Sequence, residues 1–200
     1  EEVDLIVTGD FELDRSLALK LARKAPCSVL LVPAQSKGDF TKVCLSVDLS
    51  KYSDHVLDCA VAFAASKELE SIDCVTFFAM PDGFQDTRLP RGRLLEELKE
   101  LTERQLADFL NAHELKGLAC NASAVRSPIP GTTLLSLANE NGYDLLVVGC
   151  RGKDALTATL LGSNAEDVIR GSKHAAVLAV KEKGTGKSFL QSLLKLSSAS

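Results

Sequence analysis

The residues of this chain best suited to chemistry are glycines at fixed spacing in its C-terminal third. The apolar run Asp144-Leu-Leu-Val-Val-Gly149 is followed by Gly152, and Gly162-Ser163 then opens a helical pattern. Glycines let backbone N–H groups approach an anion without a Cβ in the way, and a helix N-terminus adds free donors and about half a positive charge. The spacing therefore predicts a phosphate-binding loop, with a nucleotide as its ligand.

A carboxylate at the end of an earlier apolar run is the second candidate contact. The run that starts at Lys42 ends in Val47-Asp48. Ligands of open α/β sheets bind outside the carboxyl ends of the strands, where the strand order reverses. If this strand lies beside the one that ends at Gly149, Asp48 faces the glycine loop and can accept hydrogen bonds from ribose hydroxyls or an adenine amine. The structural alternative is that Asp48 caps a turn or a helix.

These residues belong to a strand–helix alternation between residues 42 and 181. Apolar runs predict strands at 42–48, 72–79, 117–125, 144–149 and 175–181, with the third and most polar of them near an edge. Helical periodicity predicts helices between them: one capped by Ser50 or Ser53, one along Leu94 to Phe109, one from Pro130 to Asn141-Gly142 and one over 163–170. Such alternation is typical of an α/β fold, here an open five-stranded parallel sheet with helices on both faces.

The start of the chain repeats part of this unit. Asp4-Leu-Ile-Val-Thr-Gly9 matches the run ending at Gly149 at an offset of 140, and Ser28-Val-Leu-Leu-Val32 matches Ala176-Val-Leu-Ala-Val180 at an offset of 148. The first copy therefore lacks eight residues where the second copy carries its glycine loop. We divide the chain into the last strand–helix–strand of a degenerate first repeat (1–35), a linker (36–41), a complete domain (42–183) and a flexible tail with a short amphipathic segment (184–200).

The first copy is expected to be structural, with one nucleotide bound per chain rather than two. Its three elements cannot cover their own apolar faces, so its strands should join the second repeat or a second chain. Every proposed ligand contact follows Lys42. Deleting residues 1–35 is therefore expected to change nucleotide affinity little.

Composition narrows the class of protein. The net charge of −4 arises from 23 basic and 27 acidic residues that are well mixed, which disfavours nucleic acid as a partner. Apolar residues make up 46% of the chain without a run long enough to span a membrane, so no membrane insertion is expected. The six cysteines show no C-x-x-C spacing and favour reduced core thiols in a cytoplasmic protein, with Cys150 singled out because it lies inside the glycine motif.

Residues 42–181 resemble a universal stress protein domain. The ATP-binding members of that family carry G-x2-G-x9-G-[S/T], which Gly149, Gly152, Gly162 and Ser163 match without a gap, and Val47-Asp48 is similar to the family's Val-Asp. The segment from Ser163 to Arg170 resembles the helix after the motif. Residues 3–33 look like the tail of a second such domain.

The resemblance implies a fold, a ligand and partners. The fold is that of the adenine nucleotide alpha hydrolase-like class, and the function is that of an ATP-binding regulatory or stress-response module. Mg²⁺ would be bound, if at all, through the phosphates, and the fifth strand would pair in a homodimer or between the two repeats. The implied nucleotide contacts, with the Phe78 ring near the adenine, are Val47, Asp48, Phe78, Val148, Gly149, Arg151, Gly152, Gly162, Ser163 and Asn164.

Two alternative functions and one incomplete motif stand beside this interpretation. The same fold can serve as an interaction module that binds no nucleotide, or it can hydrolyse ATP slowly. Faster catalysis is disfavoured because His55, His113 and His174 are dispersed outside any nucleophile or metal-ligand pattern. Gly184-Thr-Gly-Lys-Ser188 resembles the end of a Walker A loop, but the first glycine of that motif would fall at Lys181 and only twelve residues follow Ser188.

Overall fold

The computed structural model describes residues 3–9, 15–80, 91–151 and 161–181. Gly152 and the tail from residue 184, both considered above, lie outside these residues. Within the described part of the chain, seven strands form one sheet in the order β1-β2-β7-β6-β3-β4-β5. The elements are β1 (Leu5–Gly9), α1 (Arg15–Lys24), β2 (Ser28–Val32), β3 (Val43–Val47), α2 (Ser53–Ser66), β4 (Ser71–Phe78), α3 (Arg91–Asn111), β5 (Ala119–Arg126), α4 (Pro130–Asn141), β6 (Leu145–Gly149), α5 (Ser163–Gly171) and β7 (Ala176–Val180).

The five strands from β3 to β7 form the predicted parallel sheet. Each neighbouring pair among them, β7–β6, β6–β3, β3–β4 and β4–β5, is parallel. The polar strand β5 lies at the edge, as its composition predicts. The sheet as a whole is larger than five strands and is mixed, because β1 and β2 extend it beyond β7 through an antiparallel β2–β7 pair.

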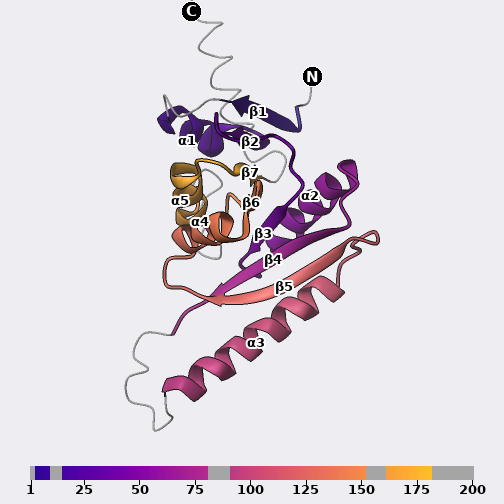
Figure 1. Ribbon diagram of the computed structural model, residues 1–200, viewed down its shortest axis with the longest axis vertical. Helices are drawn as coiled ribbons and strands as arrows, with labels where there is room; N and C mark the ends of the chain where they lie inside the picture. The colour runs from indigo at the N-terminus through magenta and orange to yellow at the C-terminus, as the bar shows by residue number, and fades with distance from the viewer. Residues whose placement is uncertain (1–2, 10–14, 81–90, 152–160, 182–200) are drawn as a thin grey trace, which may run out of the picture.

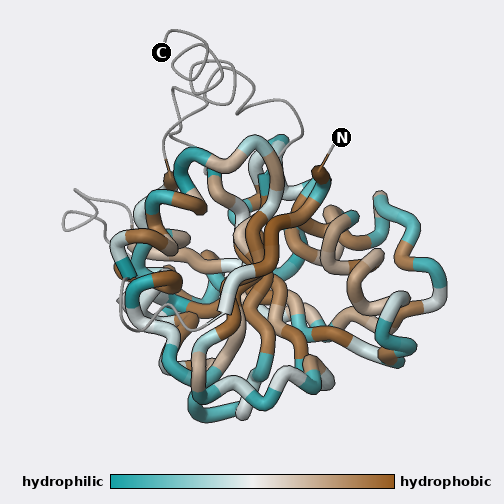
Figure 2. Tube along the Cα trace, turned by 90° about the horizontal axis from the view of Figure 1, so that it is seen from above, coloured by the Kyte–Doolittle hydropathy of each residue, from teal (hydrophilic) through white to brown (hydrophobic). Residues whose placement is uncertain are grey.

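Helices cover both faces of this sheet (Figure 1). Helices α1, α4 and α5 enclose one apolar core against the sheet, and α2 and α3 enclose a second core on the opposite face. Figure 2 shows the hydrophobic residues concentrated along the central strands, with hydrophilic residues at the periphery. The strands β6 and β7 are apolar at every position because both of their faces are covered.

Helix α4 starts and stops where the sequence predicts. Helix α4 begins at Pro130, whose missing N–H costs nothing in a first turn, and it ends before Gly142, which has the left-handed conformation with φ of 68°.

The Asp144 carboxylate accepts the backbone N–H groups of Thr41 at 2.7 Å and Lys42 at 2.9 Å. This carboxylate fixes the start of β3 against the start of β6.

The N-terminal β1–α1–β2 segment has the same register as β6–α5–β7. Leu5 pairs with Ser28 in the first unit, and Leu145 pairs with Ala176 in the second, which are equivalent residues at offsets of 140 and 148. In the antiparallel β2–β7 pair, Leu30 lies opposite Leu178, its own counterpart. The two units are thus related locally by a two-fold axis through this pair.

Side chains fasten the N-terminal segment to the rest of the chain. The Lys181 ammonium donates to the carbonyl oxygens of Arg23 at 2.7 Å and Ala25 at 3.0 Å, at the C-terminal end of α1, where a cation complements the helix dipole. The backbone N–H of Lys181 donates to Ser28 Oγ at 3.1 Å. The end of β7 and the end of α1 are therefore held as one structure.

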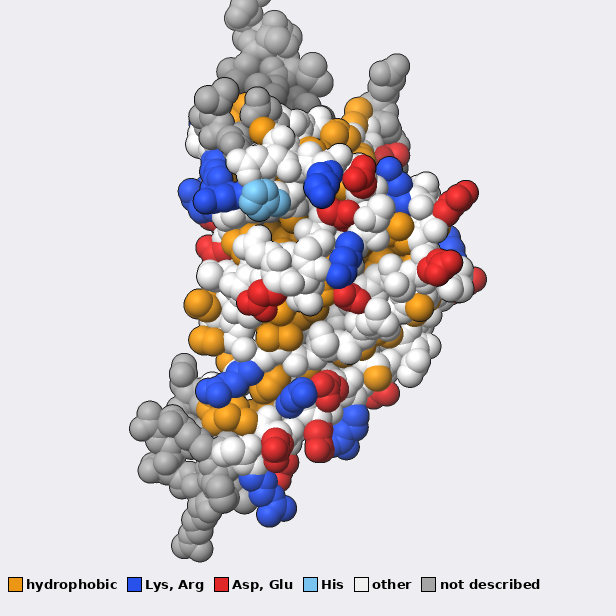
Figure 3. Space-filling view, in the orientation of Figure 1, with side chains coloured by type: hydrophobic (Ala, Val, Ile, Leu, Met, Phe, Trp, Pro, Cys, Tyr) orange, Lys and Arg blue, Asp and Glu red, His pale blue; other side chains and the backbone are white. Residues whose placement is uncertain are grey.

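The surface carries no large area of one charge on the face shown in Figure 3, where basic and acidic side chains are interspersed. No helix in the described ranges is long and apolar enough to cross a membrane. All six cysteines are described, and each is a free thiol.

Two leucines of the N-terminal segment give a matched test of its packing. Leu31 is fully buried against the core formed with α1, whereas Leu17 is 51% exposed. We expect Leu31→Ala to lower the free energy of unfolding by about 2–5 kcal/mol, because it leaves a cavity. Leu17→Ala should change it by less than about 0.5 kcal/mol, as measured by urea denaturation. Equal effects would contradict the packing described for β2.

Deleting residues 1–35 should cause aggregation or a change of oligomeric state. The deletion leaves the edge of β7 unpaired and uncovers Val168 and Ile169, which are buried in the core shared with α1. Light scattering of the full and shortened chains measures the effect. An equally soluble shortened chain of unchanged oligomeric state would refute this expectation.

Candidate functional site

The carboxyl ends of β3 and β6 meet at the point where the strand order reverses. From β3 the chain continues outward through β4 and β5, whereas β6 and β7 lie on the other side of β3. Val43 to Ser46 pair in parallel with Leu145 to Val148, so the neighbour relation on which the predicted site depends is confirmed. Ligands of open α/β sheets bind in the crevice at such a point.

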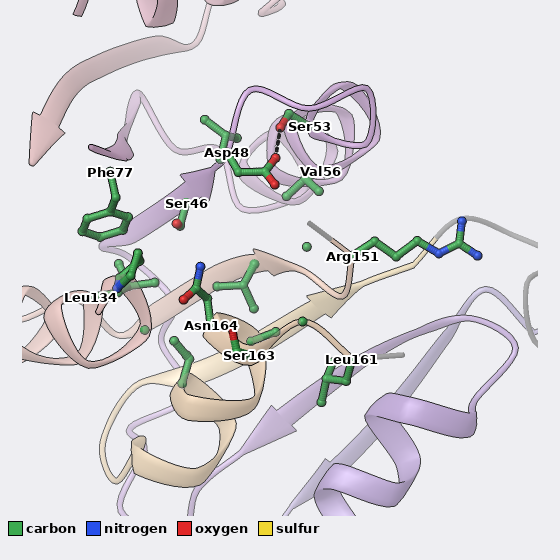
Figure 4. A pocket seen from close by; sticks show the side chains of 18 residues that line it. Ser46, Asp48, Ser53, Val56, Phe77, Leu134, Arg151, Leu161, Ser163 and Asn164 are labelled. Atoms are coloured by element: carbon green, nitrogen blue, oxygen red, sulfur yellow. Dashed lines mark hydrogen bonds between the residues drawn. The ribbon is translucent and has the colours of Figure 1, made fainter. Parts of the chain in front are cut away.

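A cavity of about 420 Å³ occupies this crevice. That size lies within the range of about 300–1,000 Å³ usual for small-molecule sites. The first turns of α2, α4 and α5 all contribute to its wall, because a right-handed strand–helix–strand connection starts each helix at the carboxyl edge of the sheet. The lining residues, drawn in Figure 4, are Ser46, Val47, Asp48, Ser53, Val56, Phe77, Pro130, Gly131, Leu134, Val148, Gly149, Arg151, Leu161, Gly162, Ser163, Asn164, Ala165 and Val168.

The structure brings most of the predicted contact residues to this one cavity. The residues of the predicted set that line it are Val47, Asp48, Val148, Gly149, Arg151, Gly162, Ser163 and Asn164. Gly152 lies outside the described residues. Phe78 does not line the cavity, and its neighbour Phe77 does.

The pleat of β4 explains why Phe77, and not the predicted Phe78, lines the cavity. Successive side chains of a strand point to opposite faces of the sheet. Val75 and Phe77 contact the core beneath α4 and α5, whereas Ile72 and Cys74 belong to the core beneath α2 and α3. The residue next to the cavity is therefore the odd-numbered phenylalanine.

Asp48 takes part in a turn as well as in the cavity wall. Its Oδ1 accepts the backbone N–H of Ser50 and the Ser53 hydroxyl, both at 3.0 Å. The bond to Ser53 is the dashed line in Figure 4. Helix α2 begins at Ser53, and its N-cap residue Tyr52 makes no side-chain cap bond, so neither serine caps the helix as predicted. The capping alternative for Asp48 is partly realised, and these bonds also fix where its carboxylate stands.

The start of α5 forms the opposite wall. The Gly162 N–H donates to the Cys150 carbonyl at 2.8 Å, and the Glu166 N–H donates to the Gly162 carbonyl at 3.0 Å. Gly162 has φ of −61° and ψ of 144°, an extended conformation open to any residue. The helix N-terminus, with its first-turn N–H groups and partial positive charge, therefore lies at the cavity through Ser163 and Asn164.

Charged side chains contribute little to the described wall. Asp48 and Arg151 are its only ionisable residues, and the three histidines lie elsewhere. The Arg151 side chain extends away from the other labelled residues in Figure 4, with its guanidinium 5.2 Å from the centre of the Tyr52 ring. The described residues hold no group of three or more potential metal ligands. The described wall therefore consists mainly of backbone groups and uncharged side chains.

Cys150 lies in the glycine motif but behind the cavity. It is 2% exposed, its Sγ lies 3.9 Å from the Ala22 carbonyl of α1, and burial raises the pKa of its thiol to about 12. A protonated, enclosed thiol is a poor nucleophile. The functional role that the position of Cys150 in the motif suggests is therefore not supported.

No pattern in the sequence directly indicates the part of the wall formed by α4. Pro130, Gly131 and Leu134 line the cavity. A Cβ on Gly131 would lie 2.6 Å from the Asp167 Cβ and 2.8 Å from the Asn164 carbonyl oxygen, so glycine is what lets α4 approach α5. An isolated Gly after a helix-starting Pro does not reveal this contact, which involves residues more than thirty positions away. The other lining residues outside the predicted set are Ser46, Ser53, Val56, Phe77, Leu161, Ala165 and Val168.

Comparison with known proteins decides the family. The sequence profile described as "Universal stress protein family" matches residues 39–181, well over half of the chain. This chain belongs to the universal stress protein family. The match spans the unit from the start of β3 to the end of β7, so the whole candidate cavity lies within the family domain.

Individual relatives agree with this assignment. Universal stress protein MJ0577 of Methanocaldococcus jannaschii is 39% identical over 57 residues, which are 28% of this chain and 35% of that protein, so the match spans about a third of the relative. The solved structure of protein MJ0577 superposes with a TM-score of 0.53 at 26% identity, covering 72% of this chain and 99% of that one. A universal stress protein solved in complex with cAMP gives 0.52 at 25% identity, covering 74% and 100%.

A longer structure extends the likeness of fold. A protein of Pseudomonas aeruginosa described as functionally unknown superposes with a TM-score of 0.67 at 17% identity, covering 96% of this chain and 67% of that one. Coverage of 96% includes residues of the N-terminal segment as well as the family domain. The likeness of fold therefore extends beyond the family domain into the N-terminal segment.

The close approach of α4 and α5 can be tested at Gly131. We expect Gly131→Ala to lower the free energy of unfolding by about 1–3 kcal/mol, because the added methyl group overlaps atoms of α5. Gly92→Ala in α3 is the control, since its Cβ meets nothing within 4 Å. That substitution should be neutral or stabilise by about 1 kcal/mol through helix propensity. Thermal or urea unfolding measures both, and equal stability of the two variants would contradict the described contact.

Proposed function

We propose that this universal stress protein domain binds an adenine nucleotide, ATP in the first instance, in the cavity between β3 and β6. The observation that carries the proposal is that the predicted contact residues converge on one cavity. Eight residues that the glycine spacing and the family resemblance assign to phosphate and nucleoside binding line one cavity at the switch point of the sheet. Three helix N-termini open onto the same cavity, and their dipoles favour an anion.

The phosphates are assigned to the side formed by β6 and α5. Gly149 ends β6, Gly162 to Asn164 start α5, and the motif also supplies Gly152. Backbone N–H groups at a helix start bind phosphate oxygens without a charged side chain. Mg²⁺ is proposed only as an ion carried by the phosphates, since Asp48 is the one carboxylate in the described wall.

The nucleoside is assigned to the side formed by β3 and β4. Asp48 is held in place by Ser50 and Ser53, and a carboxylate there can accept hydrogen bonds from ribose hydroxyls. The Phe77 ring offers an apolar surface for the base. The family member solved with cAMP supports an adenine nucleotide as the ligand class.

The wall favours binding over catalysis. Its described residues include neither a histidine nor a cysteine to act as base or nucleophile. We therefore propose a nucleotide-dependent regulatory module, active in the cytoplasm in a stress response. Slow hydrolysis of ATP is the enzymatic alternative, and turnover of labelled ATP by purified protein distinguishes it. A module that uses no nucleotide is the remaining alternative.

We propose one nucleotide site per chain and an intramolecular pairing of two unequal repeats. The equal registers of β1–β2 and β6–β7 support the interpretation of residues 1–35 as a degenerate copy. The outer edge of β7, through which a homodimer would pair, is occupied by β2 of the same chain. A dimer of this protein would therefore need another surface.

Direct measurement of bound nucleotide tests the proposal. Mass spectrometry of small molecules released from purified protein should detect an adenine nucleotide, or calorimetric titration should show ATP binding with a stoichiometry near one. A stoichiometry near two would show that the N-terminal copy also holds phosphate. The absence of released nucleotide, together with no heat of binding and no thermal shift on adding ATP, would favour the interaction module.

A pair of glycine variants locates the site. Gly162→Val should raise the Kd for ATP at least about tenfold, or 1.4 kcal/mol, because the side chain enters the space assigned to phosphate. Gly9→Val, at the counterpart of Gly149 in the first copy, is the control, since the nearest atom to its Cβ is the Val32 carbonyl oxygen at 3.9 Å. Circular dichroism checks that both fold. Unchanged ATP affinity in folded Gly162→Val would exclude the assigned phosphate position.

A further inference from the structure

Helix α5 has one side at the cavity and another against the N-terminal segment. Ser163, Asn164 and Val168 line the cavity. Val168 and Ile169 are also fully buried in the core that includes Ala18 and Ala22 of α1. Helix α5, whose N-terminus lies at the cavity, thus packs on another side against residues that precede the family domain.

A network of ion pairs and hydrogen bonds joins α1 and α5. Arg23 of α1 donates to Glu166 Oε2 at 2.5 Å, and Arg170 donates to Glu166 Oε1 at 2.6 Å. Arg15 of α1 donates in turn to the Arg170 carbonyl oxygen. The bonds from Arg170 and Arg23 lower the pKa of the Glu166 carboxyl. Glu166 is therefore ionised at neutral pH, and both ion pairs are formed.

The glycine turn is tied to the same segment. Cys150 lies between Gly149 and Arg151, and its Sγ contacts the Ala22 carbonyl at 3.9 Å. Its backbone N–H donates to the Val180 carbonyl at 2.9 Å, and the next residue along, Lys181, donates to carbonyls of α1. Both parts of the assigned phosphate side therefore have contacts with α1 or with residues that bind it.

We propose that α1 positions the phosphate side of the cavity, and that Arg23 does so by holding Glu166 and hence the first turn of α5. This inference rests on the proposed nucleotide site. Binding geometry tolerates shifts of only about 0.5 Å before contacts are lost, so a support of this kind changes affinity without touching the ligand. It differs from the expectation from sequence that deleting residues 1–35 changes nucleotide affinity little.

Positioning can be separated from simple electrostatics at Glu166. A carboxylate near a phosphate site repels the ligand, so an electrostatic role alone predicts that Glu166→Gln binds ATP more tightly. A positioning role predicts weaker binding, because the same substitution weakens the connection to Arg23. Arg170 continues to bond Glu166 when Arg23 is replaced, so Arg23→Gln mainly removes the link between helices.

The experiment is a double-mutant cycle on the full chain, read by calorimetry with ATP and with adenosine. Arg23→Gln and Glu166→Gln should each raise the Kd for ATP about fivefold, the upper range for a partly exposed pair, and the double variant should show no further rise. Affinity for adenosine, which has no phosphates, should stay unchanged. The matched control is Arg93→Gln with Glu97→Gln, an exposed pair at 3.2 Å within α3.

A second measurement needs no nucleotide. Amide hydrogen exchange at residues 166–169, where the Glu166 N–H bonds the Gly162 carbonyl, should be faster in Arg23→Gln than in the wild type and unchanged in the α3 control. Unchanged exchange, tighter ATP binding by Glu166→Gln, or additive effects in the double variant would each overturn the inference. Failure of the wild type to bind any adenine nucleotide would refute the proposed function, and hydrogen exchange would still decide whether α1 holds α5.

Discussion

The parallel pairing of β3 with β6 is the interaction on which the rest of the structure depends. It joins the first and fourth strands of the domain and reverses the direction in which the sheet is extended. Because of that reversal, the loops after β3 and β6 diverge and leave a crevice between them. The Asp144 carboxylate, bonded to Thr41 and Lys42, aligns the opposite ends of the same two strands.

The recognition that we propose at this crevice relies mainly on backbone groups. Three helices begin there because each follows a parallel strand, and their dipoles add at one place. The glycines at 131 and 149 let main chains approach where a side chain would collide, with a Cβ at 149 only 3.1 Å from Val56 Cγ2. A site of this kind holds an anion without the desolvation cost of burying several charged side chains.

Much of the fold and part of the site could be predicted because their signals are local. Strand and helix bounds follow from short periodic patterns, and the place of Gly149 and the start of α5 at one cavity follows from spacing along the chain. Phe77 was missed because choosing between adjacent phenylalanines requires the facing of β4. Gly131 and the support from α1 were missed because both depend on packing between helices, and no short pattern records which residues of distant helices meet.

The pairing of Leu30 with Leu178 also couples the two units that we propose to be unequal repeats. Residues at equivalent positions in a duplicated unit ordinarily drift apart, because each acquires its own neighbours. Here each leucine is the other's neighbour, so a substitution in one copy alters the environment of the same position in the other. A side chain that suits one unit along this seam must therefore also suit the equivalent side chain of the other.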